Sequence, residues 1–393
     1  MERLSVCFIS FNFFPGQGLT AIFEYSRKLK RLGHEVRVIA AGRQGERKFE
    51  VIDRVLVTRI PVRTVKRRSF ETLRFNLLAS RILSQMMRRN RIDIVHVFSY
   101  AFSVLMKFGM FWSLSAKNVK WVYDVRSGPL EGREKPTLIY HLAKKLLKFE
   151  STFFDATFVI DEDVKNEVLG NNSKKEIFIA PLGADLQFFE SNTKDNCLLS
   201  RYGIEEKAII LVYSGSMSSK RKLRNLILAF WKACMKVENL RLLILGEGDD
   251  VSHLKMLTEE LSISDKVFFL GYVNYVEVPK FLSVADIAVS YVPIIPAFDA
   301  QPPVKTVEYL ACSLPVIATS TRGNKHFVVH EWNGLLTKDD PSSLSKAIIK
   351  LSQDEDLREK LSQMARPSVE DYDWGTIVKR RILPAYQKIL QTQ

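Results

Sequence analysis

One stretch of the chain, 298–319, combines a cation, a carboxylate and the expected start of a helix. Two prolines suit a first helical turn, and the pattern after them predicts a helix over 304–312. The free N–H groups of such a helix start attract an anion, and Lys305 adds a positive charge between Val304 and Thr306. Glu308 follows one turn later, within reach of the same pocket. These residues predict a site for a nucleotide diphosphate and its ribose.

Two glycine-containing loops are further candidates for phosphate binding. A first strand over 4–10 leads into a loop with Gly16 and Gly18, although the third glycine of a dinucleotide fingerprint is replaced by Ala21, which makes a dehydrogenase a weak interpretation. A second strand over 208–213 leads into Gly215 and Ser216, and several cations follow in 220–224. A solvated basic turn is the alternative for this second loop.

Other polar candidates follow predicted strands in the first half of the chain. Functional groups of parallel sheets lie beyond the carboxyl ends of strands, which favours Asp124 and Arg126 as acceptor-side residues and allows His96. Asp161 and Asp163 have the spacing of a metal site. We favour a helix cap for them, because acids at a helix start bond its free N–H groups, and we predict no metal site.

The elements that hold these residues alternate between strand and helix, which predicts an α/β fold. A chain of 393 residues is long for one core and indicates two domains. We place an N-terminal domain at 1–195 and a C-terminal domain at 200–374, with a polar linker at 191–196. A helix over 377–390 closes the chain. The apolar run 97–116 is interrupted by Lys107 and serines, so we interpret it as a domain helix, not as a membrane span.

Several of these segments resemble retaining glycosyltransferases of family four, which have two Rossmann-like domains facing across a cleft (the GT-B fold). Glu308 matches the second acid of the family's Glu-x7-Glu pattern, and 312–316 (CSLPV) resembles its Gly-x-Pro-Val end. The Gly-His-Glu-Val at 33–36 is also common in the family, and the final helix resembles the one that crosses back to the N-terminal domain. The resemblance covers nearly the whole chain.

The resemblance implies roles for individual residues. Arg221 corresponds to a cation that neutralises the leaving diphosphate and, with Asp124, is our catalytic candidate. Tyr272 and Val273 match a loop that binds the base, and the Gly16–Gly18 loop meets the donor diphosphate. The complete set expected to bind the donor is Gly16, Gly18, Gly215, Ser216, Arg221, Tyr272, Val273, Val304, Lys305, Thr306 and Glu308.

Two positions depart from the family pattern. The first acid of the Glu pair falls on Ala300, beside Asp299, and the arginine expected after the glycine is Ser216. Lys220, Lys222 or Arg224 could supply the missing charge.

The positive charge is concentrated in the first half of the chain. Residues 1–200 carry 33 basic and 21 acidic residues, whereas 201–393 carry 25 and 23. The stretch 59–91 holds ten basic residues and one acid among leucines and phenylalanines. Anionic lipid headgroups would attract such a surface, and so would RNA; a solvated basic face is the third interpretation. Four cysteines without paired spacing and no signal peptide favour the cytoplasm.

Together these features predict a retaining glycosyltransferase that uses no metal and no cofactor. We expect its partners to be a nucleotide sugar, a glycan or lipid-linked acceptor of cell-surface polysaccharide synthesis, and an anionic membrane at the inner face of the cell. A sugar-nucleotide epimerase on the same fold is one alternative. A nucleic-acid-binding protein is the other, but the recognised modules and aromatic platforms for RNA are missing. Donor sugar, base and acceptor depend on loop side chains that the sequence cannot place.

Overall fold

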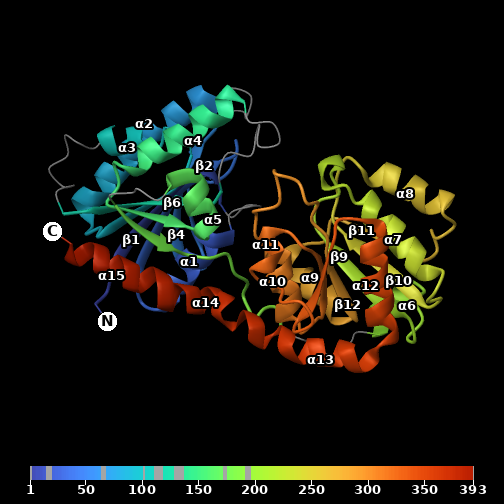
Figure 1. Cartoon of the computed structure of the whole chain (residues 1–393). Helices are drawn as coiled ribbons and strands as arrows, with labels where there is room; N and C mark the ends of the chain where they lie inside the picture. The colour runs from blue at the N-terminus through green and yellow to red at the C-terminus, as the bar shows by residue number, and fades with distance from the viewer. Residues whose placement is uncertain are drawn as a thin grey trace. The chain divides into compact units, whose positions relative to one another are not determined.

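The chain folds into two compact units (Figure 1). A computed structural model describes residues 2–14, 20–62, 68–100, 102–109, 118–127, 137–170, 175–190 and 196–392. Unit 1 comprises 1–182 and 374–393, and unit 2 comprises 183–373. The division falls after residue 182, whereas the sequence analysis places it at 195, and the last twenty residues belong to unit 1.

Unit 1 is built on a sheet in which the described residues form eight strands, in the order β3-β4-β2-β1-β5-β6-β7-β8. All pairs are parallel except β3 with β4, which form an antiparallel hairpin at one edge. The chain runs from β1 to β2 on one side and to β5 on the other, so the strand order reverses between β1 and β5. The strands are β1 (Ser5–Phe13), β2 (Glu35–Gly42), β3 (Phe49–Ile52), β4 (Val55–Pro61), β5 (Ile94–Phe98), β6 (Lys120–Val125), β7 (Ala156–Val159) and β8 (Glu176–Ile179).

Helices cover both faces of this sheet, as expected for a parallel sheet whose strands are buried on both sides (Figure 1). One apolar core lies under α1 (Thr20–Arg31), α14 (Trp374–Ile377) and α15 (Leu383–Gln391), the last two joined by a π-helical turn, Val378–Ile382. The opposite core lies under α2 (Arg68–Arg89), α3 (Val104–Gly109), α4 (Leu138–Ser151) and α5 (Glu162–Val164), which continues as a π-helical turn, Lys165–Leu169.

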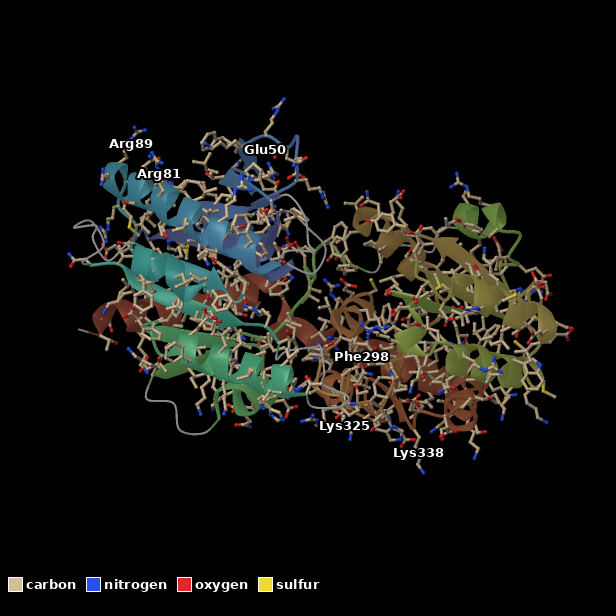
Figure 2. All side chains as sticks on the ribbon, turned by 90° about the horizontal axis from the view of Figure 1, so that it is seen from above. Glu50, Arg81, Arg89, Phe298, Lys325 and Lys338 are labelled. Atoms are coloured by element: carbon tan, nitrogen blue, oxygen red, sulfur yellow. The ribbon has the colours of Figure 1, made fainter. Side chains whose placement is uncertain are left out.

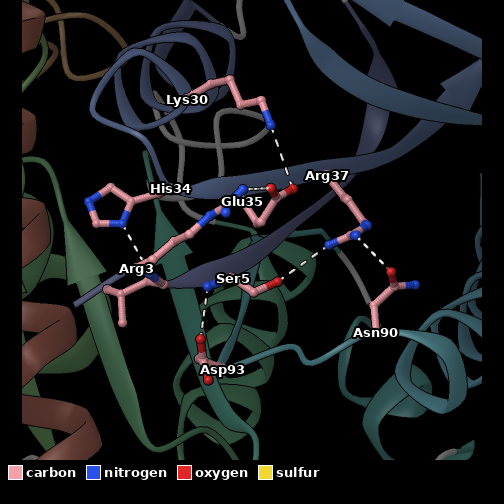
Figure 3. A network of polar contacts seen from close by, with 9 residues as sticks. Arg3, Ser5, Lys30, His34, Glu35, Arg37, Asn90 and Asp93 are labelled. Atoms are coloured by element: carbon pink, nitrogen blue, oxygen red, sulfur yellow. Dashed lines mark hydrogen bonds and ion pairs between the residues drawn. The ribbon is translucent and has the colours of Figure 1, made fainter.

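Polar side chains join the strands at the amino-terminal edge of the unit 1 sheet (Figure 3). The backbone N–H of Leu4 donates to Nδ1 of His34 at 3.1 Å, and that of Ser5 donates to Asp93 at 2.8 Å. Glu35 pairs with Arg3 and, at 3.5 Å, with Lys30. His34 is therefore a structural residue at the edge opposite to the carboxyl ends of the strands.

A buried polar chain ties the C-terminal segment to the middle of unit 1. His96 accepts at Nδ1 from the Tyr386 hydroxyl (2.6 Å), because its Nε2 must donate to the Asp124 carboxylate (2.9 Å). The Arg126 guanidinium bonds the same carboxylate at 2.6 Å and the Tyr25 hydroxyl at 2.8 Å. Burial lowers the pKa of His96, so the ring is neutral in this position.

Unit 2 is built on a second parallel sheet, with six strands among the described residues in the order β11-β10-β9-β12-β13-β14. Here the order reverses between β9 and β12. The strands are β9 (Ile209–Ser214), β10 (Leu240–Leu245), β11 (Val267–Gly271), β12 (Ile287–Ser290), β13 (Val316–Thr319) and β14 (Gly334–Thr337). In an open α/β sheet, such a reversal leaves a crevice beyond the carboxyl ends of the two strands.

Helices again cover both faces of the unit 2 sheet, over two separate apolar cores (Figure 1). The first core includes side chains of α6 (Asn196–Arg201), α9 (Val278–Ser283) and α10 (Val304–Ala311). The second includes side chains of α7 (Arg224–Cys234), α8 (Val251–Glu260) and α12 (Pro341–Gln353). The remaining elements are α11 (Arg322–Lys325), α13 (Glu355–Ala365) and the 3-10 turns Ser219–Arg221, Tyr275–Glu277 and Pro367–Tyr372.

The interpretation of the run 97–116 as a domain helix is wrong for its first residues, which complete β5. The helix that the described part of this run contains is the short α3. The described part of this apolar run is the end of a buried strand followed by a helix that packs against α2. Periodicity alone does not separate two such elements. No helix in the described segments is long and apolar enough to cross a membrane.

The buried chain from Tyr386 to Arg126 makes a testable prediction about unit 1. Tyr386→Phe leaves Nδ1 of His96 without its donor inside the core, which should cost about 1–3 kcal/mol of unfolding free energy in urea titrations. Tyr372→Phe is the matched control, because its hydroxyl bonds the His326 carbonyl at 3.3 Å in an exposed place where water can replace it. Equal losses in both variants would contradict a structural role for the chain.

Candidate functional site

The loops after β9 and β10 touch each other through their backbones at the reversal of the unit 2 sheet. Gly215, which follows β9, has a φ of 146° that favours glycine. A Cβ on Gly246, after β10, would lie 2.0 Å from the carbonyl oxygen of Gly215. Two hydrogen bonds, Gly215 N to Leu245 O and Met217 N to Glu247 O, both 2.9 Å, hold the loops together. The turn at 215–216 is therefore fixed, with both residues exposed to solvent.

The first turn of α10 faces the same turn. Helix α10 begins after Pro303, and no side chain caps its start. The ammonium Nζ of Lys305 lies 3.6 Å from the position of a Cβ on Gly215 and 3.8 Å from the centre of the Tyr213 ring. It also donates to the carbonyl of Tyr291, beyond β12, at 3.3 Å. Uncapped N–H groups and an ammonium group thus meet at the end of β9, which is an arrangement suited to an anion.

A second cation comes from the 3-10 turn after β9. The guanidinium of Arg221 stacks over the ring of Phe298, with 4.2 Å between the guanidinium carbon and the ring centre. Phe298, labelled in Figure 2, belongs to the loop that precedes α10. No ion pair with a carboxylate is found for Arg221 or Lys305 within the part of the chain described here. Burial, and then the charge of Arg221, lower the pKa of Lys305 well below its usual value, while Glu308 opposes the shift.

Glu308 lies one turn further along α10. Its carboxyl group is buried, and burial raises its pKa to about 7, although a hydrogen bond from Tyr275 and the charge of Lys305 act in the opposite direction. The group is therefore half-ionised near neutral pH. A polar ligand that donates hydrogen bonds would favour the ionised form.

The other predicted donor residues of unit 2 occupy different environments. Tyr272 and Val273 follow β11 at the same edge of the sheet, and the Tyr272 ring is exposed. The Thr306 hydroxyl is not available to a ligand, because it is buried in a network with Ser290 (2.6 Å) and Asn324 (3.0 Å). Val304 is half-buried at the helix start, so only its backbone suits an anion.

The structure shows what surrounds Ala300 and Ser216, the two positions that depart from the family pattern. Ala300 is buried, and the carboxylate of the adjacent Asp299 bonds both the backbone N–H (3.1 Å) and Nε (2.8 Å) of Arg322 at the start of α11. Asp299 is therefore engaged within the protein. The cations that follow Ser216 in the sequence, Lys220, Lys222 and Arg224, are exposed. The ammonium group of Lys305, by contrast, lies close to the Gly215 turn. Sequence spacing does not reveal this neighbour, which is 90 residues away.

The predicted residues of unit 1 do not form an open site. His96 and Asp124 are completely buried and bond each other, so a substrate cannot reach either side chain in this arrangement. This corrects our expectation that Asp124 contacts an acceptor. Burial raises the pKa of Asp124, but Arg126 and His96 lower it, and because the two partners outweigh burial the pKa lies below its usual value. Arg126 retains partial exposure. Gly16 and Gly18 lie outside the described residues.

Asp161 caps a helix, as we favoured. Its carboxylate accepts from the backbone N–H of Val164 at 2.7 Å. Within the described ranges, no group of three or more His, Cys, Asp or Glu side chains could hold a metal ion.

Burial of Glu308 makes a prediction about pH. Between its ordinary value of 4.5 and about 7, the folded protein holds a proton that the unfolded chain releases, so this group costs stability as pH rises through that window. Glu308→Gln cannot ionise, and should stabilise the ligand-free fold by about 1–3 kcal/mol near pH 8 but hardly near pH 5. Urea unfolding at both values measures this, with the exposed Glu277→Gln as control. An equal difference at both pH values would contradict the burial of an ionised carboxylate.

Comparison with known proteins finds two matching glycosyltransferase families. Residues 198–367 match the family described as glycosyl transferases group 1, and residues 20–188 match glycosyltransferase family 4. The alpha-monoglucosyldiacylglycerol synthase of Acholeplasma laidlawii is 24% identical over 367 residues, which cover 90% of this chain and 89% of that protein.

Solved structures share the fold at low sequence identity. Sucrose-phosphate synthase from Thermosynechococcus elongatus has a TM-score of 0.76 and 18% identity, with all of both chains covered. Anabaena HepE in complex with UDP and glucose has a TM-score of 0.73 and 14% identity, covering 98% of this chain and all of that one.

Proposed function

Because the chain is a member of the group 1 glycosyltransferases with the GT-B fold, we propose that it moves a hexose-type sugar from a nucleotide-diphosphate sugar to an acceptor, with retention at the anomeric carbon and without a metal ion. The observation that carries this proposal is the position of Lys305, whose ammonium group lies beside the Gly215 turn and the uncapped start of α10. The bound UDP of the HepE complex supports a nucleotide donor.

In the proposed mechanism, unit 2 stabilises the leaving diphosphate. Lys305 and Arg221 supply two positive charges, and the N–H groups at the start of α10 supply a dipole aimed at the same place. Lys305 takes the role of the family cation that is replaced by Ser216. Since negative charge grows on the diphosphate as the glycosidic bond breaks, these groups bind the transition state more tightly than the substrate. The sugar, carrying oxocarbenium-like positive charge, is then attacked from the face that the diphosphate leaves.

Glu308 recognises the ribose in this proposal. An ionised carboxylate accepts hydrogen bonds from two neighbouring hydroxyl groups, and those bonds repay part of the cost of burying its charge. Donor affinity should therefore rise with pH through about 7. Tyr272 and Val273, at the end of β11, are proposed to contact the base.

Unit 1 is proposed to bind the acceptor, with Arg126 as its partly exposed polar group. The relative from Acholeplasma laidlawii is named for a glucosyldiacylglycerol product, which supports a lipid or lipid-linked acceptor. We accordingly propose that the enzyme works at the cytoplasmic face of a membrane, in the synthesis of a cell-surface glycan.

Binding of UDP tests the donor site. Removing the Lys305 charge with Lys305→Gln should weaken UDP about 10- to 100-fold in calorimetry, since a charge-assisted hydrogen bond contributes about 1.5–3 kcal/mol. Lys220→Gln removes an equal charge from an exposed neighbour and should change affinity little. Glu308→Gln should lose about tenfold with UDP, but nothing further with a dideoxyribose analogue. Similar losses for Lys220→Gln and Lys305→Gln would contradict the assignment of Lys305.

Metal independence is tested by chelation. If Asp161 serves as a helix cap, EDTA should leave turnover unchanged, and Asp161→Ala should lower stability by about 1 kcal/mol without lowering activity in proportion. Asp163→Ala is the control, since Asp163 is not the capping residue. Activity that is lost with EDTA and restored by magnesium or manganese would overturn the proposal.

A further inference from the structure

Three neighbouring helices of unit 1 form one continuous outer layer. Helix α2 contacts α3 through Asn76, whose side chain donates to the Phe102 carbonyl at 2.8 Å, and through Ser80, which donates to Met106 O at 2.9 Å. Helix α3 is tied in turn to α4, because the N–H of Val104 donates to the buried Glu150 carboxylate at 3.1 Å. Figure 1 shows the three helices side by side over one face of the sheet.

The outer side of this layer is unusually apolar. Of the 22 large apolar side chains exposed in the described part of the chain, nine belong to these helices and a tenth, Phe102, lies just before α3, so the apolar exposure is concentrated in this one layer. They are Phe70, Leu73, Leu77, Phe102, Leu105, Phe108, Leu138, Ile139, Leu142 and Phe149.

Helix α4 carries the most exposed of these side chains. Leu138 and Ile139 are 74% and 72% exposed, and Leu142 and Phe149 are each more than half exposed. The positions 138, 142, 145 and 149 follow one stripe of the helix, in which Lys145 is the polar member. A stripe of this kind normally packs against a neighbour, yet here it faces outward.

The charges on the outer side of the layer are all positive. The three helices contain two acids, Glu71 and Glu150, and both are buried. The exposed charges are those of Arg81, Arg88, Arg89, Lys145 and Lys148. Figure 2 shows Arg81 and Arg89 pointing away from unit 1.

In the structure, several basic residues of the stretch 59–91, which suggested membrane binding, form ion pairs within the protein. Arg59 is buried and pairs with Glu50 at 2.6 Å, Arg74 contacts Glu71, and Arg91 pairs with Asp93 at 2.6 Å. The charges of these three residues are paired within the protein. Attraction by charge alone is thus weaker than the sequence count suggests, which gives the exposed apolar side chains more weight.

We propose that the outer layer α2–α3–α4 docks on a bilayer of anionic phospholipid, with the apolar stripe of α4 entering the headgroup region and the cations of the three helices contacting phosphate groups. Apolar side chains on helices whose own exposed charges are positive complement such a bilayer, although Glu167 of the adjacent segment bonds Tyr140 of α4. A second copy of this layer would be repelled by its own charge. The inference rests on the proposed function only in that this membrane would contain the acceptor.

The test is sedimentation of the full chain with vesicles of phosphatidylcholine, alone or in equal parts with phosphatidylglycerol. The variant Leu138→Ser, Ile139→Ser, Leu142→Ser should lose at least about tenfold in partitioning to the anionic vesicles, because three apolar side chains no longer enter the lipid. Its matched control is Met235→Ser, Met256→Ser, Val329→Ser, which removes three exposed apolar side chains from unit 2 and should bind as the wild type does. Unfolding curves of both variants check that the fold is kept.

A charge variant separates the two contributions. The triple variant with Arg81→Gln, Arg88→Gln and Arg89→Gln should bind more weakly than the wild type at low salt. At high salt it should match the wild type, because the charges are then screened and the apolar contribution remains.

Equal binding of the α4 variant and the wild type would overturn the inference, as would no binding of the wild type to anionic vesicles. A wild-type dimer that becomes monomeric in the α4 variant would overturn it too, by assigning the stripe to a second copy. UDP affinity, measured alongside, should be the same in every variant as in the wild type. If the wild type did not bind UDP, the proposed donor site would be wrong, but the docking result would still stand.

Discussion

The proposed donor site depends on one cation, Lys305, for which no ion pair with a carboxylate is found among the described residues. Lys305 is half-buried between the Tyr213 ring, the Tyr291 carbonyl and the Gly215 turn, with Arg221 as a second positive charge nearby. Burial and like charge both disfavour its protonated form, as its lowered pKa reflects. The negative charge of the proposed ligand would favour the protonated form and so offset both effects. The cost of assembling these charges in the empty protein is therefore recovered when a diphosphate binds, and more fully when further negative charge develops on it.

The fold maintains this arrangement through backbone contacts more than through side chains. Close approach of the loops after β9 and β10 requires glycine at 246, and it fixes the turn that Lys305 faces. On the other side, Thr306 joins α10 to β12 and α11 through Ser290 and Asn324. The residues proposed to contact the ligand are thus few, while those that hold the helix start in position are buried and polar.

Much of the architecture could be predicted from the sequence, because both sheets consist of apolar strands in regular alternation with helices. The helix predicted over 304–312 is present as α10, and the strand predicted before Gly215 is present as β9. Strand β3 and helix α4 were not predicted, since several of their apolar residues are exposed and do not follow the pattern of a buried face. Asp124 was assigned to an acceptor because it ends a strand, yet its burial under α15 depends on Tyr386, which is 262 residues later in the sequence. The proximity of Lys305 to the Gly215 turn is likewise a tertiary contact that spacing does not encode.

The central claim is that the diphosphate of the donor lies between the Gly215 turn and the start of α10. A crystal structure of the protein with bound UDP tests this most directly. The account predicts that phosphate oxygens lie within hydrogen-bond distance of Lys305 Nζ, the Arg221 guanidinium and the first N–H groups of α10, with the ribose hydroxyls on Glu308. A nucleotide bound elsewhere on unit 2, with Lys305 still bonded to the Tyr291 carbonyl and touching no phosphate, would contradict it.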